Sequence, residues 1–178
     1  MPGRERTLPE ELATTVPAAS WRGPVRSEGA VRTGTVALLL LGAALMARLV
    51  GRTIVPLDLD GALLAALGAV LGLMAIDALT GFIHWACDTW GDEDTPVVGR
   101  LLIQGFREHH RLHQLMLEHD WVVLNRQPAL GATALLALAA LPGPMRALEA
   151  SSALAGFVVA FLGAGALANQ LHQWAHQP

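Results

Sequence analysis

The sequence has 178 residues, of which 53% are hydrophobic and only 15% are charged. Soluble domains of this size usually carry about a quarter charged residues, so the composition indicates a small, single-domain membrane protein. The net charge of −3 argues against a nucleic-acid partner, and a single cysteine, Cys87, excludes an internal disulfide framework and any multi-cysteine zinc or iron–sulfur site.

Four apolar stretches follow a polar N-terminal segment. Residues 1–32 contain prolines and charges of both signs but nothing like a cleavable signal peptide, so we expect a disordered cytoplasmic tail. The apolar stretches are 33–50, 61–87, 128–141 and 150–176. About 20 residues cross a hydrocarbon core, which the second and fourth stretches exceed and the first nearly reaches. The third is short enough to be tilted, re-entrant or buried. The prediction is an all-α, multi-pass membrane protein with about four transmembrane helices.

Arginine counting predicts the orientation. All 12 basic residues are arginines: five lie in the tail, four lie between the second and third stretches, and three lie on the other side. The positive-inside rule therefore places both termini and the long intervening segment in the cytoplasm.

Histidines are confined to one side of the predicted membrane. The seven are His84, His109, His110, His113, His119, His172 and His176. In a four-crossing topology they all lie at the cytoplasmic ends of the second and fourth helices or in the segment between, as a metal site at the bilayer surface requires. Imidazole suits iron, copper, zinc and nickel, so ligand type does not identify the metal. The alternative is that these histidines only anchor helices at the interface.

Helical spacing groups the polar residues further. Asp77, His84 and Asp88 follow at i, i+7 and i+11, which places them on one stripe of the second helix. An ionisable residue within a span is costly, so Asp77 is expected to have a partner such as an imidazole N–H. In the fourth stretch, Asn169 and two histidines share a face at i, i+3 and i+7.

A cytoplasmic, histidine-bearing helix is predicted between the second and third stretches. Asp94 is a capping residue and Pro96 suits the first helical position, which predicts a helix over roughly 96–118. His109 and His110 are adjacent and project about 100° apart, so they suit two neighbouring metal ions.

Four segments in this order carry a family resemblance. They are residues 81–91 (GFIHWACDTWG), 106–110 (FREHH), 119–120 (HD) and 169–176 (NQLHQWAH). Their order and wording resemble the plasmanylethanolamine desaturase (Kua-type) lipid desaturases, with plant trans-3 fatty-acyl desaturases as more distant relatives. The resemblance covers about residues 77–176.

The resemblance implies a membrane oxidoreductase of lipid metabolism. Such an enzyme uses a non-haem di-iron centre, O2 and two electrons to introduce a double bond into a phospholipid chain, most characteristically the vinyl-ether bond of plasmalogens. Cytochrome b5 or ferredoxin would be the kind of electron donor. The implied iron ligands are His84, His109, His110, His119, His172 and His176. Asp88, Glu108 and Asp120 match acidic positions of the catalytic site and would orient imidazoles, with Asp77 and Asn169 in supporting positions. His113 matches no family histidine.

Two departures from the family pattern bear on activity. Val123 stands where the family usually has glutamate, and Arg126 stands where it usually has glycine. Family members also continue to a final His-x-x-His-His box, so we expect residues 33–178 to be a desaturase domain truncated at its C-terminus.

Three alternatives remain open at this point. They are a trans-3 fatty-acyl phospholipid desaturase, a membrane electron carrier with bis-histidine haem, and a truncated, non-catalytic membrane protein.

Overall fold

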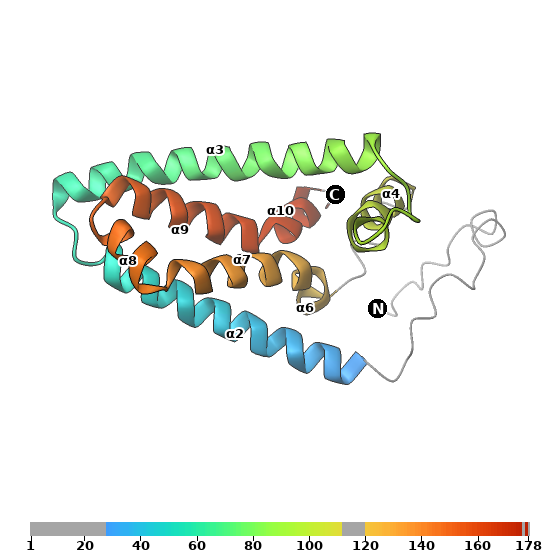
Figure 1. Cartoon of the computed structure of the whole chain (residues 1–178), viewed down its shortest axis with the longest axis horizontal. Helices are drawn as coiled ribbons and strands as arrows, with labels where there is room; N and C mark the ends of the chain where they lie inside the picture. The colour runs from blue at the N-terminus through green and yellow to red at the C-terminus, as the bar shows by residue number, and fades with distance from the viewer. Residues whose placement is uncertain (1–27, 112–119, 176, 178) are drawn as a thin grey trace, which may run out of the picture.

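The computed structural model describes residues 28–111, 120–175 and 177, and every regular element within these ranges is a helix. In chain order the elements are α2 (Glu28–Thr53), α3 (Leu59–Thr89), the π-helix η2 (Gly99–Ile103), α4 (Gln104–Arg111), α6 (Trp121–Leu124), α7 (Arg126–Ala139), α8 (Pro142–Glu149), α9 (Ser152–Ala166) and α10 (Ala168–Ala175) (Figure 1). The predicted all-α fold is confirmed.

Two helical segments, Val31–Thr53 and Leu59–Thr89, are long and apolar enough to cross a membrane. Two bent pairs pass the same test together: α7 and α8 meet at 83°, and α9 and α10 at 58°. Among the described residues there are thus two to four candidate spans, in agreement with the predicted multi-pass architecture. Large apolar side chains such as Leu63, Leu67 and Val70 are exposed on α3, as a lipid-facing surface requires.

Two boundaries differ from the sequence prediction. Helix α2 begins at Glu28, so residues 28–32 are helical rather than part of the tail, whereas 1–27 lie outside the described residues. The fourth apolar stretch is not one continuous helix, because α9 ends at Ala166 and α10 continues at an angle. Gly163 and Gly165 lie in the last turn of α9, where glycine weakens helical structure.

The helix predicted over 96–118 starts later and irregularly. Thr95 and Asp92 form a turn in which the Asp92 N–H donates to Thr95 Oγ1 (2.9 Å) and Asp92 Oδ1 accepts from the Asp94 N–H (3.1 Å). Val97, which would lie in the first turn of the predicted helix, has a positive φ of 68° and is therefore not helical. The chain instead enters the π-helix η2 and then α4, and the end of the predicted helix, 112–118, lies outside the described residues.

Helices α3 and α9 lie side by side with their backbones in contact (Figure 1). A Cβ atom added at Gly68 would lie 1.9 Å from the carbonyl oxygen of Ala153, and one added at Gly156 would lie 1.9 Å from that of Ala65. Helices surrounded by lipid associate through close van der Waals packing, and small residues let their backbones approach closely. Glycine is therefore required on both sides of this contact.

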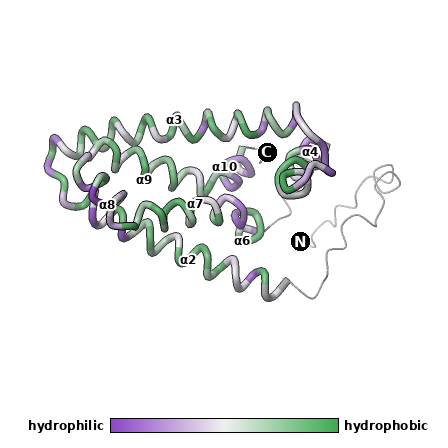
Figure 2. The backbone as a smooth tube through the Cα atoms, in the orientation of Figure 1, coloured by the Kyte–Doolittle hydropathy of each residue, from purple (hydrophilic) through white to green (hydrophobic). Residues whose placement is uncertain are grey.

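Polar residues gather at the two ends of the helical bundle, whereas the middle is apolar (Figure 2). One end holds the turn between α2 and α3 together with α8. The other end holds α4, α6, α10 and the end of α3 that carries His84. The described parts of the predicted histidine-bearing segments thus lie at one end of the bundle.

Candidate metal centre

Three side chains from α3 and α4 form a compact cluster, here called the His–Asp cluster: His84, Asp88 and His110. His84 and Asp88 are one turn apart near the end of α3, and His110 comes from α4. The Nε2 atoms of the two histidines are 2.8 Å apart. Asp88 Oδ2 lies 3.0 Å from His110 Nε2 and 3.5 Å from His84 Nε2.

The donor set of the His–Asp cluster suits a transition-metal ion. One potential ligand atom from each residue lies within 4.8 Å of the other two. Two imidazole nitrogens and one carboxylate are the donors that non-haem iron sites use, with further coordination positions left open. The side chains are 28% (His84), 34% (Asp88) and 49% (His110) exposed, so the cluster is accessible at the helix ends. The described residues therefore include a cluster that could bind a metal ion.

Two further rings surround His84. The Phe106 ring, on α4, lies with its centroid 4.8 Å from that of His84, and the His172 ring, on α10, lies 6.1 Å away. The Arg107 side chain donates to the Gly91 carbonyl (2.7 Å), which holds α4 against the segment that follows α3. The C-terminal helix thus brings a third histidine beside the cluster.

A network of amides positions α10, and only Asn169 among its members was singled out from the sequence. Asn169 Nδ2 donates to the Leu124 carbonyl (2.9 Å) rather than to an imidazole. Buried Asn125 donates to Gln170 Oε1 (3.4 Å), and Gln170 Nε2 donates to Gln173 Oε1 (2.9 Å). The sequence signal that could have identified this network is the presence of uncharged amide side chains in a strongly apolar sequence. Buried polar groups are normally hydrogen-bonded, so such amides are expected to pair with one another.

Asp77 lies on the same stripe as the cluster but apart from it. Asp77 and His84 are seven positions apart, which is about 10 Å along a helix. Its side chain is exposed, and within the described ranges no imidazole donates to it. The partner predicted for Asp77 therefore stays a prediction.

Several predicted site residues cannot be placed. His119 and His176 lie outside the described residues, and the side chains of Glu108 and His109 also lie outside the described part of the structure. Their roles stay predictions.

Asp120 joins two helices instead of contacting the cluster. It accepts from Arg32 on α2 (2.6 Å) and caps α6 by accepting from the N–H groups of Val122 (2.8 Å) and Val123 (3.2 Å). The hydrogen bond from Val123 holds the pKa of Asp120 below its ordinary value, and Arg32 and Val122 act in the same direction. In the structure Asp120 thus serves helix capping and helix pairing.

This shift predicts a pH-dependent stability. Because the pKa is lower in the folded state, the stabilisation by the Asp120 carboxylate is fully present above about pH 4, the ordinary range of aspartate, and is lost as pH falls through the lowered pKa. Asp120→Asn keeps a capping side chain but removes the charge, so it should lower the thermal unfolding temperature at pH 7. The gap to the wild type should close toward pH 3. A difference in unfolding temperature that stays constant from pH 7 to pH 3 would contradict the prediction. Arg32→Gln should lower the unfolding temperature less than Asp120→Asn does.

The helices and the His–Asp cluster together describe a multi-pass membrane protein with a histidine–carboxylate site at one end of its bundle. The chain belongs to the lipid desaturase family, because the family model described as "Lipid desaturase domain" matches residues 73–178, more than half of the sequence. The match covers α10, η2, α4 and the part of α3 that carries the cluster. The predicted resemblance to lipid desaturases is confirmed.

Curated relatives agree with this family. The chain is 36% identical to plasmanylethanolamine desaturase 1 of Mus musculus over 118 residues, which is 64% of this chain and 43% of the relative. It is 36% identical to plasmanylethanolamine desaturase of Myxococcus xanthus over 115 residues, or 60% and 37%. It is 33% identical to chloroplastic fatty acid desaturase 4 of Arabidopsis thaliana over 112 residues, or 62% and 32%. The matches span about two fifths of the length of the first two relatives. No solved structure matches the chain significantly.

Proposed function

We propose that this protein is a membrane lipid desaturase that introduces the vinyl-ether double bond of plasmalogens at a non-haem di-iron centre. The observation that carries the proposal is the convergence of His84, Asp88 and His110, with the His172 ring beside them, in a chain of the lipid desaturase family. The relatives whose names specify a plasmanylethanolamine desaturase support the choice of substrate.

The His–Asp cluster supplies part of the ligand set. If this site held iron, the chemistry supplied there would use O2, two electrons and two protons: two hydrogens would be removed from adjacent carbons of the substrate, and O2 would be reduced to two waters. His84 and His110 would bind through neutral nitrogens, and Asp88 would either ligate or fix an imidazole tautomer. The remaining ligands are proposed to come from His109, His119, His172 and His176. Neutral ligands limit the charge that accumulates next to lipid.

Packing around the cluster holds the His84 ring. Phe106 covers it from α4, and His172 lies on another side. With two neighbours fixing its orientation, His84 keeps Nε2 directed toward His110 and Asp88. A preorganised donor set of this kind loses less conformational freedom when a ligand binds.

The aromatic side chains near His84 suit a site at the membrane interface. Trp85 packs against Trp90 (centroids 4.7 Å apart) and against Phe82 (5.7 Å), and all three are about half exposed on or just after α3. Tryptophan favours the boundary between headgroups and acyl chains. We propose that the headgroup of the substrate stays in this layer while its chain reaches the cluster.

The orientation and the electron donor are also part of the proposal. The excess of arginines in the tail and in the segment between α3 and α6 supports a cytoplasmic position for the His–Asp cluster. A cytoplasmic donor such as cytochrome b5 or ferredoxin would reach the cluster from that side.

Lipid analysis of expressing cells tests the substrate. Expression in a host that makes plasmanyl but not plasmenyl phospholipids should produce vinyl-ether lipids detectable by mass spectrometry. The similarity to a chloroplastic fatty acid desaturase favours a second candidate, a trans double bond in a phospholipid acyl chain. New acyl unsaturation without vinyl ether would decide for that candidate, and unchanged lipids from well-expressed protein would contradict both.

A further inference from the structure

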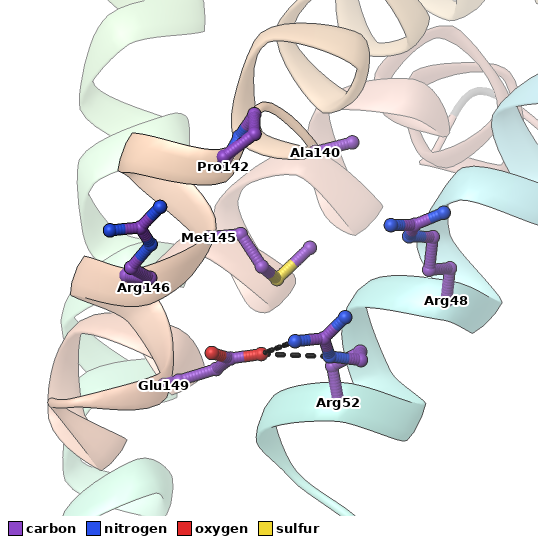
Figure 3. A pocket seen from close by; sticks show the side chains of 7 residues that line it. All are labelled: Arg48, Arg52, Ala140, Pro142, Met145, Arg146 and Glu149. Atoms are coloured by element: carbon purple, nitrogen blue, oxygen red, sulfur yellow. Dashed lines mark hydrogen bonds and ion pairs between the residues drawn. The ribbon is translucent and has the colours of Figure 1, made fainter.

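A cavity of about 180 Å³ lies between α2 and α8, at the opposite end of the bundle from the His–Asp cluster (Figure 3). We call it the arginine cavity, because three of the charged residues that line it are arginines. The charged lining residues are Arg48, Arg52, Arg146 and Glu149. The family resemblance does not extend to Arg48 and Arg52, which precede the matched residues 73–178.

The arginine cavity has unneutralised positive charge. Arg52 pairs with Glu149, to which its Nε donates over 2.7 Å and toward which a second guanidinium nitrogen also points (Figure 3). Arg48 and Arg146 make no ion pair within the described residues. Three guanidinium groups against one carboxylate leave a charge of 3 − 1 = +2 at the cavity.

The position of this charge along the bundle matches that of lipid phosphates. Arg48 and Arg52 are one turn apart at the end of α2, where the candidate span ends at Thr53. Helix α8 turns by 83° from α7 and so runs across the end of the bundle. Arginines at helix ends extend toward the headgroup layer, where the phosphates of a bilayer lie.

The walls of the arginine cavity are held in place by packing. Met145 and Leu148 of α8 are 4% and 5% exposed and belong to a buried cluster that includes Leu49 of α2. Leu49 follows Arg48 in the sequence, and Met145 precedes Arg146. The guanidinium groups therefore extend from backbones that core contacts fix, which lowers the entropic cost of binding.

We propose that the arginine cavity binds the phosphate group of an anionic phospholipid. Guanidinium groups donate two parallel hydrogen bonds to phosphate oxygens. A charge of +2 favours a headgroup such as phosphatidylglycerol, whose phosphate is not neutralised by an ammonium group, over phosphatidylcholine. This lipid site is separate from the proposed centre of desaturation and does not depend on it.

The test measures phospholipid binding to the purified full chain in a nonionic detergent. Native mass spectrometry should detect phosphatidylglycerol bound more tightly than phosphatidylcholine. Arg48→Gln and Arg146→Gln should each weaken phosphatidylglycerol binding about fivefold. Arg126→Gln is the matched control, because Arg126 is also exposed but lies at the start of α7, at the other end of the bundle, and this variant should bind like the wild type.

Each other outcome overturns the proposal. Unchanged phosphatidylglycerol binding in both cavity variants would remove the site, and equal binding of both phospholipids would remove the preference for anionic lipid. If inorganic phosphate displaced phosphatidylglycerol at the same concentration, the cavity would be a site for soluble anions and not for lipid. Unfolding temperatures without lipid check that the variants fold, and Arg146→Gln carries the test should Arg48→Gln fail to fold.

Discussion

Replacing His84 by alanine is expected to abolish both iron binding and lipid desaturation. His84 has three described ring neighbours, because Phe106, His110 and His172 all lie beside it. Substitutions that only disturb the orientation of a ligand already lower metal affinity about 10- to 100-fold, so removing a ligand should lower it at least about 100-fold. Iron per chain by plasma mass spectrometry and vinyl-ether lipid by lipid mass spectrometry measure the two effects.

The matched control for this variant is His113→Ala. His113 lies outside the described residues and matches no histidine of the family, so iron content and product should be unchanged. Asp88→Asn separates the two roles proposed for that residue: a ligand requires the carboxylate, whereas an acceptor for an imidazole N–H tolerates the amide with a smaller loss. Wild-type iron and product in His84→Ala would exclude His84 from the ligand set.

Gly68→Ala is expected to destabilise the bundle by about 3 kcal/mol. The added methyl group would lie 1.9 Å from the Ala153 carbonyl oxygen and 3.0 Å from the Phe157 nitrogen, both of which are backbone atoms that no rotamer change can move. Helices α3 and α9 must therefore separate. Thermal unfolding in detergent, followed by circular dichroism, should show a lower midpoint than the wild type.

Gly81→Ala is the control within the same helix. Nothing lies within 4 Å of a Cβ at Gly81, and alanine is favoured over glycine in helices by up to about 1 kcal/mol, so this variant should be at least as stable as the wild type. Equal midpoints for Gly68→Ala and the wild type would mean that α3 and α9 do not pack as described. Because α10 follows α9, the same separation would move His172 away from His84.

Helical periodicity and hydropathy were sufficient to predict the overall fold and the part of the metal site that lies on α3. The apolar stretches correspond to α2, α3, α7 and α9, and the spacing of polar residues placed His84 and Asp88 on one stripe of α3. Periodicity fixes which residues share a face of a helix, and hydropathy fixes the depth in the membrane. These two constraints put His172 at the same end as His84 before any contact was known.

Contacts between helices were beyond such reasoning. Asp120 pairs with Arg32, a residue of the expected tail, 88 positions away, and its predicted role at the catalytic site stays a prediction. The arginine cavity likewise depends on the bend between α7 and α8, which brings Arg146 toward α2. The sequence contains no local signal for these pairs, because bend angles follow from packing rather than from residue spacing.

Iron content and the visible absorption spectrum of the purified full chain test the metal-centre proposal most directly. A site made by His84, Asp88 and His110 predicts tightly bound non-haem iron in at least one equivalent per chain, with no Soret band. A strong Soret band would indicate a haem electron carrier instead. A chain that is folded, has been supplied with ferrous iron and still holds none would contradict the metal centre itself.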